Sequence, residues 1–282
     1  METKMKTAIS MWSMDRKIQS EGLRQTEFID WAKSAGFRYV ELLSYYMEKE
    51  KSMPEVIALL HHTGIDVSCY TILTDFTDSS DSRFEEFLHD LEVASKLTAP
   101  FIRVLAGEMN SDKSSAITNI VRGLKDAAEA AAKKNVTLIL ENIGPYSCRS
   151  EDIKHILEKV DSPFLMLNFD TANSLLAGED PLNSFVDLKS YISYIHFKDF
   201  ISEKEAEFEA IASKDANRIQ KSDTGVSYTG ITAGKGIVPL SALMEALESQ
   251  RYDGFVSIEY EGTGDSLTDT ENSFEYLKSI SW

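Results

Sequence analysis

The sequence predicts a (β/α)8 TIM barrel, an α/β fold in which residues 1–282 form a single domain. Short β-branched or aliphatic runs alternate with longer amphipathic stretches, which is the pattern of a parallel α/β protein. Eight such runs occur in 282 residues, and no Pro- or Gly-rich linker divides them. Eight repeats in a chain of this length favour a closed barrel over an open sheet. The strand-like runs cover residues 7–12, 37–42, 65–71, 101–106, 136–141, 164–170, 194–198 and 255–261.

The helical patterns between these runs end at recognisable stop signals. The stretch "TEFIDWAKSAG" closes on Gly36, and the alanine-rich second half of "SAITNIVRGLKDAAEAAAKKN" closes on Asn135. Gly64 precedes the run at 65–71 in the same way. Gly and Asn are the residues that most readily adopt the left-handed conformation at a helix end, so these positions mark the predicted helix boundaries.

One connection is much longer than a crossover requires. Residues 199–254 separate the seventh and eighth runs, whereas most connections in α/β units take a helix and a few loop residues. The helix expected before the eighth strand, "GIVPLSALMEALESQ", accounts for the last part. The remainder, around residues 201–233, is an insertion that is either a solvated charged decoration or a lid over the barrel mouth.

Composition narrows the class of protein and of partner. The formal charge of -17 repels polyanions, which disfavours nucleic acid and anionic membranes and leaves small-molecule substrates. There is no apolar run of membrane-spanning length and no signal-peptide pattern, so a cytoplasmic location is expected. Cys69 and Cys148 lack the spacing of a thiolate metal site or a disulfide framework. The sequence leaves open whether the chain forms a homo-oligomer.

Alternation along the predicted strands turns a set of ionisable side chains into the barrel. Residues i and i+2 share a face of a strand, so the aliphatic positions that face the helices identify the inward ones. Some of these inward residues also have a purely structural alternative role. Glu41 would then pair with Arg38 or Arg103, Lys198 would form a salt bridge with Asp170 or Glu259, and a lone inward His would be a core residue. The inward ionisable set is Glu41, Arg103, Glu141, Asp170, His196, Lys198, Glu259 and Glu261.

Four of these residues predict a metal site. Glu141, Asp170, His196 and Glu259 fall at the carboxyl ends of four strands that follow one another in sequence, where barrel enzymes place their sites. Three carboxylates in a low-dielectric mouth repel one another unless a cation compensates them. Three carboxylates and one imidazole suit one divalent ion, Mn2+ before Mg2+ or Co2+, with Zn2+ still open. The chemistry expected of such an ion is Lewis-acid catalysis on a hydroxy-carbonyl compound.

Several motifs, in order, resemble a known family. "VTLILEN", "LNFDTAN", "IHFKD", "AGKGIVPL" and "YDGFVSIEYEG", with "GFRYVELL" and "FIRVLAGE" before them, resemble the sugar phosphate isomerase/epimerase superfamily of xylose isomerase-like TIM barrels. The resemblance covers nearly the whole chain. It implies that Glu141, Asp170, His196 and Glu259 bind one divalent metal, and that Glu141 and Glu259 act as the acid/base pair.

The chain also departs from relatives in that family. Many carry His three residues after the strand-six Asp, where this chain has Asn173. The acidic residue after the strand-five ligand and the arginine after the strand-seven His that mark ketohexose 3-epimerases are absent from "ENIGPYS" and "HFKDFIS". These departures favour a substrate other than a plain ketohexose, such as a keto-sugar derivative, a sugar acid or an inositol-type ketone. Lys198, Arg103 and Asn173 are the expected substrate-binding residues.

The leading expectation is a metal-dependent sugar isomerase or epimerase that removes a proton from a keto-sugar or polyol ketone and passes through an enediolate. The alternative is an inosose-type dehydratase that uses the same site and expels a β-hydroxyl. An abasic-site endonuclease is disfavoured by the charge of -17 and because only His196 sits at an inward strand end. The intact quartet disfavours a sugar-binding barrel without catalysis. The remaining histidines are His61, His62, His89 and His155.

Overall fold

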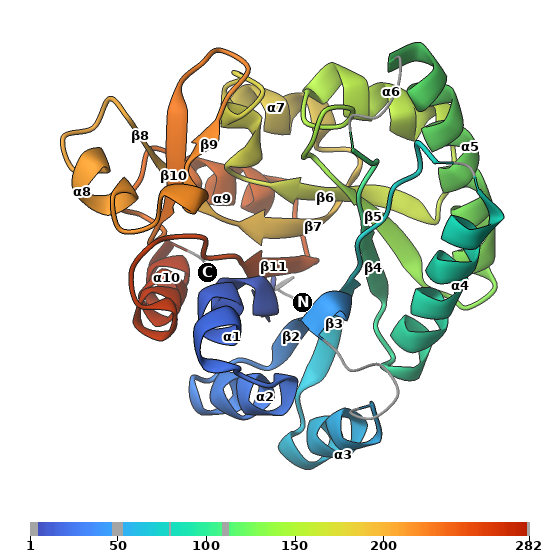
Figure 1. The fold of residues 1–282 in the computed structure, drawn as a ribbon, viewed down its shortest axis with the longest axis horizontal. Coiled ribbons are helices and arrows are strands. Elements are labelled where there is room, and N and C mark those ends of the chain that lie inside the picture. Colours follow the sequence, from blue (N-terminus) through green and yellow to red (C-terminus); the bar gives the residue numbers. More distant parts are fainter. Residues whose placement is uncertain (1–4, 47–52, 79, 109–112, 281–282) are drawn as a thin grey trace.

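The computed structural model describes residues 5–46, 53–78, 80–108 and 113–280, and its centre is a closed barrel of eight strands (Figure 1). All neighbouring strands are parallel, and their order around the barrel is β1-β11-β7-β6-β5-β4-β3-β2. The predicted fold class is therefore confirmed. The barrel strands are β1 (Lys6–Ser10), β2 (Tyr39–Leu43), β3 (Asp66–Thr71), β4 (Phe101–Val104), β5 (Thr137–Glu141), β6 (Leu165–Asp170), β7 (Ile192–Phe197) and β11 (Phe255–Ile258).

Helices cover the outside of the barrel, and their apolar faces pack on the outward side chains of the strands (Figure 1). The stop signals act as predicted: Gly36 and Asn135 follow helices and have positive φ angles of 90° and 55°. None of the helices in the described part of the chain is long and apolar enough to span a membrane. The helices outside the insertion are α1 (Asp15–Glu21), α2 (Gln25–Ser34), α3 (Met53–Thr63), α4 (Asp81–Lys96), α5 (Lys113–Ala132), α6 (Ser150–Val160), α7 (Pro181–Leu188), α9 (Leu240–Ser249) and α10 (Ser266–Ile280).

The barrel interior is divided into an apolar layer and a polar layer. Aromatic rings fill the layer formed by the first halves of the strands, where the centroid of Tyr194 lies 5.8 Å from those of both Phe101 and Phe255. Ala8, Cys69 and Ile139 complete this cluster. Since this layer closes the amino-terminal end, the polar groups farther along the strands are confined to the carboxyl-terminal mouth.

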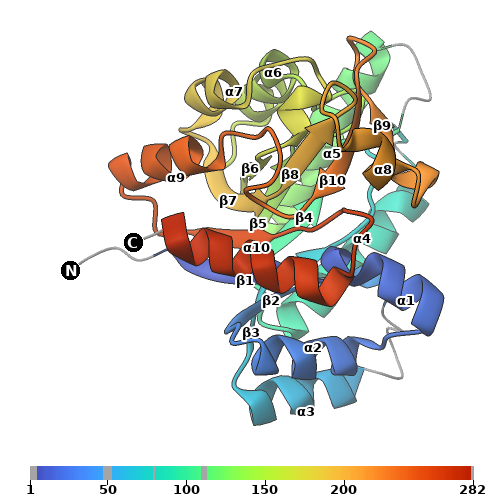
Figure 2. The ribbon, with the colours of Figure 1, turned by 90° about the vertical axis from the view of Figure 1, so that its left-hand side faces the viewer.

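The long connection between β7 and β11 forms a small antiparallel sheet rather than the charged helix or excursion its sequence suggests. Its strands are β8 (Asp199–Ser202), β9 (Gln220–Lys221) and β10 (Ser227–Ile231), in the order β8-β10-β9, with the short helix α8 (Phe208–Ala212). Figure 2 shows this sheet at the same end of the barrel as α1.

Both ends of the inserted sheet are fastened to the barrel. Ion pairs join Arg218 to Asp15 at the start of α1, and Arg149 to Asp223 at 2.7 Å before α6. The Asp199 carboxylate accepts hydrogen bonds from the backbone N–H groups of residues 234, 236 and 238. Gly230 in β10 bridges to Gly262, just beyond β11. The inserted sheet is thus held against the residues that follow β11.

The contact at Gly230 gives a test of this packing. A Cβ there would lie 2.7 Å from the Glu261 carbonyl oxygen and 2.8 Å from the Gly262 nitrogen, both backbone atoms that cannot rotate away. Gly230→Ala should therefore lower the free energy of unfolding by about 1–3 kcal/mol, measured by chemical denaturation. Thr229→Val is the matched control, because the Thr229 hydroxyl is buried without a hydrogen-bond partner and its loss should cost nothing. Equal stability of the two variants would show that Gly230 is not tightly packed.

Candidate metal centre

Four side chains converge where β5, β6, β7 and β11 end. Glu141 is the last residue of β5, Asp170 is the last of β6, and His196 lies in β7 opposite Asp170. Glu259 follows β11, and its N–H donates to the carbonyl of Phe197, so it continues the ladder past the last strand residue. Each residue offers one ligand atom, and these atoms all lie within 4.8 Å of one another. All four residues are buried, so the structure brings together the quartet that alternation predicted.

The imidazole of His196 points one nitrogen at the three carboxylates. Its Nδ1 lies 3.4 Å from Glu259 Oε2, 3.6 Å from Glu141 Oε1 and 4.0 Å from Asp170 Oδ2. Nδ1 has no hydrogen-bond partner despite its burial. A buried nitrogen without a partner is uncommon, and here it faces an oxygen-rich space.

The other imidazole nitrogen contacts Glu41, a residue whose role the sequence did not indicate. His196 Nε2 lies 3.1 Å from each of the two Glu41 carboxylate oxygens. The alternative role of Glu41, an ion pair with Arg38 or Arg103, is wrong. Arg38 lies near the exposed Asp66 instead, at 3.8 Å, and Arg103 contacts Glu141. Alternation shows that Glu41 points inward, but not which strand across the closed barrel it meets.

Two cations compensate the carboxylates. Lys198 Nζ lies 2.8 Å from Asp170 Oδ2 and 3.3 Å from Glu259 Oε2, and the guanidinium of Arg103 bonds to Glu141 Oε2. The ion pairs given as an alternative for Lys198 are therefore present. Lys198 also lies 3.5 Å from Glu261, which accepts a 2.7 Å hydrogen bond from Trp12 Nε1. Trp12 was not among the site residues predicted from the sequence.

These charges set the protonation of the site. Burial alone would raise the pKa of Glu141, but Arg103 and His196 hold that pKa well below its usual range. Burial is likewise outweighed at Glu259, where His196 and Lys198 lower the pKa to about 2. At Asp170 burial prevails over Lys198 and raises the pKa to about 7. Burial would lower the pKa of His196, but Glu259, Glu41 and Glu141 raise it well above its usual value.

Amide groups fix the directions of two carboxylates. Asn173 Nδ2 donates to Glu141 Oε1 at 3.1 Å, and the backbone N–H of Asn173 donates to Asp170 Oδ1 at 3.0 Å. Asn142 holds the β6 backbone, because its Oδ1 accepts from the N–H of Asp170 at 2.6 Å. Asn173, expected at the substrate, thus lies beside the cluster with its amide nitrogen engaged by Glu141.

The donor set fits a metal ion. Besides Nδ1 of His196, Oδ2 of Asp170 lacks a hydrogen bond; its charged neighbours are the Lys198 ammonium at 2.8 Å and His196 Nδ1 at 4.0 Å. One imidazole nitrogen and three carboxylates are hard ligands that suit divalent cations. The buried cluster of Glu141, Asp170, His196 and Glu259 could therefore hold a metal ion.

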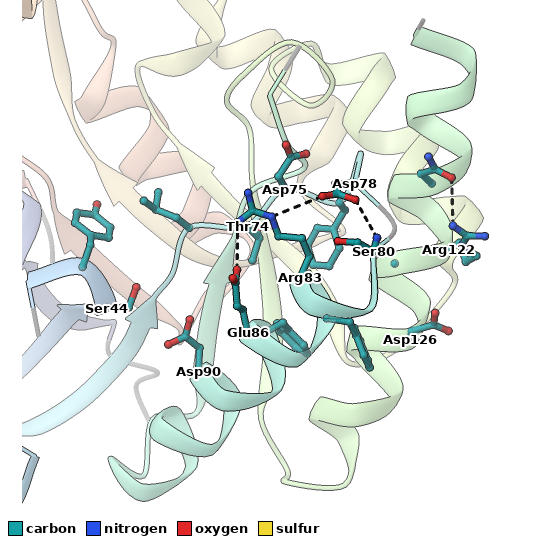
Figure 3. Close-up of a pocket in the computed structure, with 17 residues that line it drawn as sticks. Ser44, Thr74, Asp75, Asp78, Ser80, Arg83, Glu86, Asp90, Arg122 and Asp126 are labelled. Carbon is teal, nitrogen blue, oxygen red and sulfur yellow. Dashed lines mark hydrogen bonds and ion pairs between the residues drawn. The ribbon is translucent and has the colours of Figure 1, made fainter. Parts of the chain in front are cut away.

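Two adjoining cavities lie near the site, although none of the four cluster residues lines either of them. The inner cavity, about 670 Å³, reaches Arg103, and the outer cavity, about 710 Å³, extends to Tyr45 and α5. They share Leu73, Thr74, Asp75 and Arg83. Figure 3 shows the outer cavity, with Arg83 held between Asp78 and Glu86. The inner cavity therefore approaches the cluster through Arg103, which contacts Glu141.

Comparison with known proteins gives relatives of similar size. An inosose dehydratase from Lacticaseibacillus casei is 23% identical over 246 residues, which cover 83% of this chain and 80% of that enzyme. The solved structure of the probable 3-DHS dehydratase involved in petrobactin synthesis from Bacillus anthracis has a TM-score of 0.76 at 19% identity, covering 97% of this chain and 99% of the other. A D-psicose 3-epimerase from Clostridium cellulolyticum, solved with D-tagatose, has a TM-score of 0.75 at 14% identity, covering 98% and 99%.

At these identities the likeness to the solved structures speaks for the fold alone. The family assignment comes from the sequence, in which residues 29–280 match the family described as "Xylose isomerase-like TIM barrel". That match spans most of the chain and includes all four residues of the cluster. The chain belongs to the xylose isomerase-like TIM barrel family.

Proposed function

We propose that this protein is a divalent-metal-dependent enzyme that removes a proton next to the carbonyl of a keto-sugar or related polyol ketone. The observation that carries the proposal is the convergence of three carboxylates on the unpartnered Nδ1 of His196. Glu141, Asp170, His196 and Glu259 would hold the ion, with Mn2+ the leading candidate and Mg2+, Co2+ and Zn2+ as alternatives. When bound, such an ion polarises a carbonyl and acidifies the adjacent C–H.

Glu141 and Glu259 are the proposed bases. Both have lowered pKa values, so both are ionised at neutral pH, and the same charges that lower the pKa make each a weaker base in the absence of substrate. They come from β5 and from the end of β11, which are separated around the barrel by β6 and β7. A substrate lying between them would present opposite faces to the two carboxylates. One can remove the proton and the other can return it, which inverts the carbon.

Lys198 and Arg103 are proposed to bind substrate oxygens. The pKa of Lys198 is well above its usual value, because Asp170, Glu261 and Glu259 outweigh the effect of burial, so the ammonium stays charged. A fixed ammonium at this position can stabilise negative charge that develops on the substrate. Arg103 lines the inner cavity and can hydrogen-bond a hydroxyl while it contacts Glu141. Asn173 is the third proposed contact, through its unpartnered Oδ1.

The cavities favour a neutral, hydroxyl-rich substrate. Acidic side chains outnumber the two arginines, Arg83 and Arg122, in the lining of the outer cavity. A phosphate or carboxylate would meet net repulsion there, whereas hydroxyl groups can donate to the carboxylates. The acidic residues of that lining are Asp75, Asp78, Glu86, Asp90 and Asp126.

Dehydration is a second candidate of equal standing. It begins with the same proton removal, after which the β-hydroxyl leaves instead of a proton returning. The inosose dehydratase relative favours it, as does the ammonium of Lys198, which can hydrogen-bond a departing hydroxyl. Epimerisation and dehydration therefore share their first step and part at the second.

Metal binding can be tested at Asp170. Asp170→Asn removes one anionic ligand and should lower Mn2+ affinity by more than about 100-fold, since even losses at residues that only support the ligands cost about 10- to 100-fold. Equilibrium dialysis with elemental analysis measures this. Asp180→Asn is the control, because Asp180 caps α7, and Asn caps a helix equally well. Full Mn2+ occupancy in Asp170→Asn would refute the ligand assignment.

The reaction can be tested by NMR in D2O with a panel of keto-sugars, sugar acids and inosose in the presence of Mn2+. A turned-over substrate should gain deuterium at the carbon next to the carbonyl, and loss of one water in the product separates dehydration from epimerisation. Lys198→Met should lower turnover by about 10²- to 10³-fold with unchanged Mn2+ content, because one charged donor to the oxyanion is lost. Turnover without deuterium incorporation would contradict the proton-transfer mechanism.

A further inference from the structure

Glu41 is a completely buried carboxylate beneath the metal cluster, and its partners come from three other strands. Its Oε1 accepts a hydrogen bond from the Thr71 hydroxyl at 2.6 Å, and its Oε2 accepts one from Ser257 at 2.9 Å. Tyr194 donates to Oε2 at a longer 3.3 Å. These donors lie on β3, β11 and β7. A buried carboxylate is costly unless it is hydrogen-bonded or paired, so this arrangement holds Glu41 in one orientation.

The remaining hydrogen-bonding position of the Glu41 carboxylate, between its two oxygens, is occupied by His196. Nε2 of His196 is 3.1 Å from both oxygens, a geometry in which a ring N–H donates to both. An ionised carboxylate can only accept, so this contact requires the proton on Nε2. When an ion takes the place of the proton on Nδ1, the proton that Glu41 holds at Nε2 leaves Nδ1 with a lone pair for the ion, and Nδ1 is the nitrogen that faces Glu141, Asp170 and Glu259.

The ladder between β2 and β3 is irregular beside this residue, because β3 carries one extra residue, Ser68, between the partners of Val40 and Glu41. The register between β2 and β3 shifts between Val40 and Glu41, the mark of a β-bulge. Bulges re-aim a side chain, and they are common next to active sites. The extra residue sets the register in which Glu41 pairs with Cys69, two residues before its hydrogen-bond donor Thr71.

We propose that Glu41 is a positioning residue that fixes His196 with Nε2 protonated and Nδ1 presented to the metal. Glu41 contacts neither the ion nor the substrate; it acts through His196. A carboxylate behind a metal-binding histidine holds the ring and makes the coordinating nitrogen more basic. The inference rests on the proposed metal function of the cluster. It adds Glu41 to the four ligands as a residue that the metal site needs but that does not bind the ion.

Two substitutions separate orientation from charge. Glu41→Gln keeps the shape and an oxygen acceptor for Nε2, so Mn2+ affinity should fall by about 10-fold. Glu41→Leu removes the acceptor, and affinity should fall toward about 100-fold, the upper end of the effect expected of such supporting residues. Isothermal titration of the metal-free protein with Mn2+ measures both. Thr229→Val is the control: Thr229 is equally buried, its hydroxyl has no hydrogen-bond partner, and it lies in β10, outside the barrel, so affinity should stay unchanged.

A spectroscopic measurement on the wild-type protein shows directly which imidazole nitrogen of His196 carries the proton. In the Zn2+-loaded wild-type protein, ¹⁵N-detected imidazole NMR should show Nε2 of His196 protonated and Nδ1 bound to the diamagnetic ion. Protonated Nδ1, or Mn2+ affinity in both variants equal to the wild type, would overturn the role of Glu41. Failure of the wild-type protein to bind Mn2+ would instead overturn the proposed metal function, so the two failures are distinguishable.

Discussion

The site is organised by the need to compensate carboxylates that are buried together. Glu141, Asp170 and Glu259 share a mouth with almost no solvent, where like charges repel strongly and water cannot screen them. In the structure Arg103 and Lys198 supply the opposing charge, yet burial, with Glu141 and Glu259, still raises the pKa of Asp170. A divalent ion bound by the three carboxylates and His196 would complete the compensation.

The barrel provides both the convergence and the rigidity that such a cluster requires. Parallel strands bring their carboxyl ends to one mouth, so residues distant in sequence become neighbours without a specialised loop. The aromatic layer around Tyr194 fills the barrel below the site. The inserted sheet, fastened through Arg218 and Asp199, stands at the same mouth, and Gln220 in it donates to Glu261 beside Lys198. This contact links the insertion to the site, and whether the segment also moves as a lid stays a prediction.

Strand periodicity was enough to predict the barrel and the quartet, because alternation identifies Asp170 and His196 as inward residues whatever the neighbouring strands are. It could not predict contacts that depend on barrel closure. The Glu41–His196 contact joins β2 to β7, which are not neighbours, and depends on a register shift that leaves no local signal. The Asn173 contact with Glu141 depends on a short turn after β6. The inserted sheet was missed because β9 has only two residues and its surroundings read as charged and helical.

The central claim is that the four residues bind one divalent ion through Nδ1 of His196. The most direct measurement is a crystal structure of the protein with Mn2+, with data collected at the manganese absorption edge. The account predicts one anomalous peak within about 2.0–2.5 Å of His196 Nδ1 and of oxygens from Glu141, Asp170 and Glu259, with Lys198 displaced from Asp170. An empty cluster with Lys198 still paired to Asp170, or a peak elsewhere in the barrel, would contradict it.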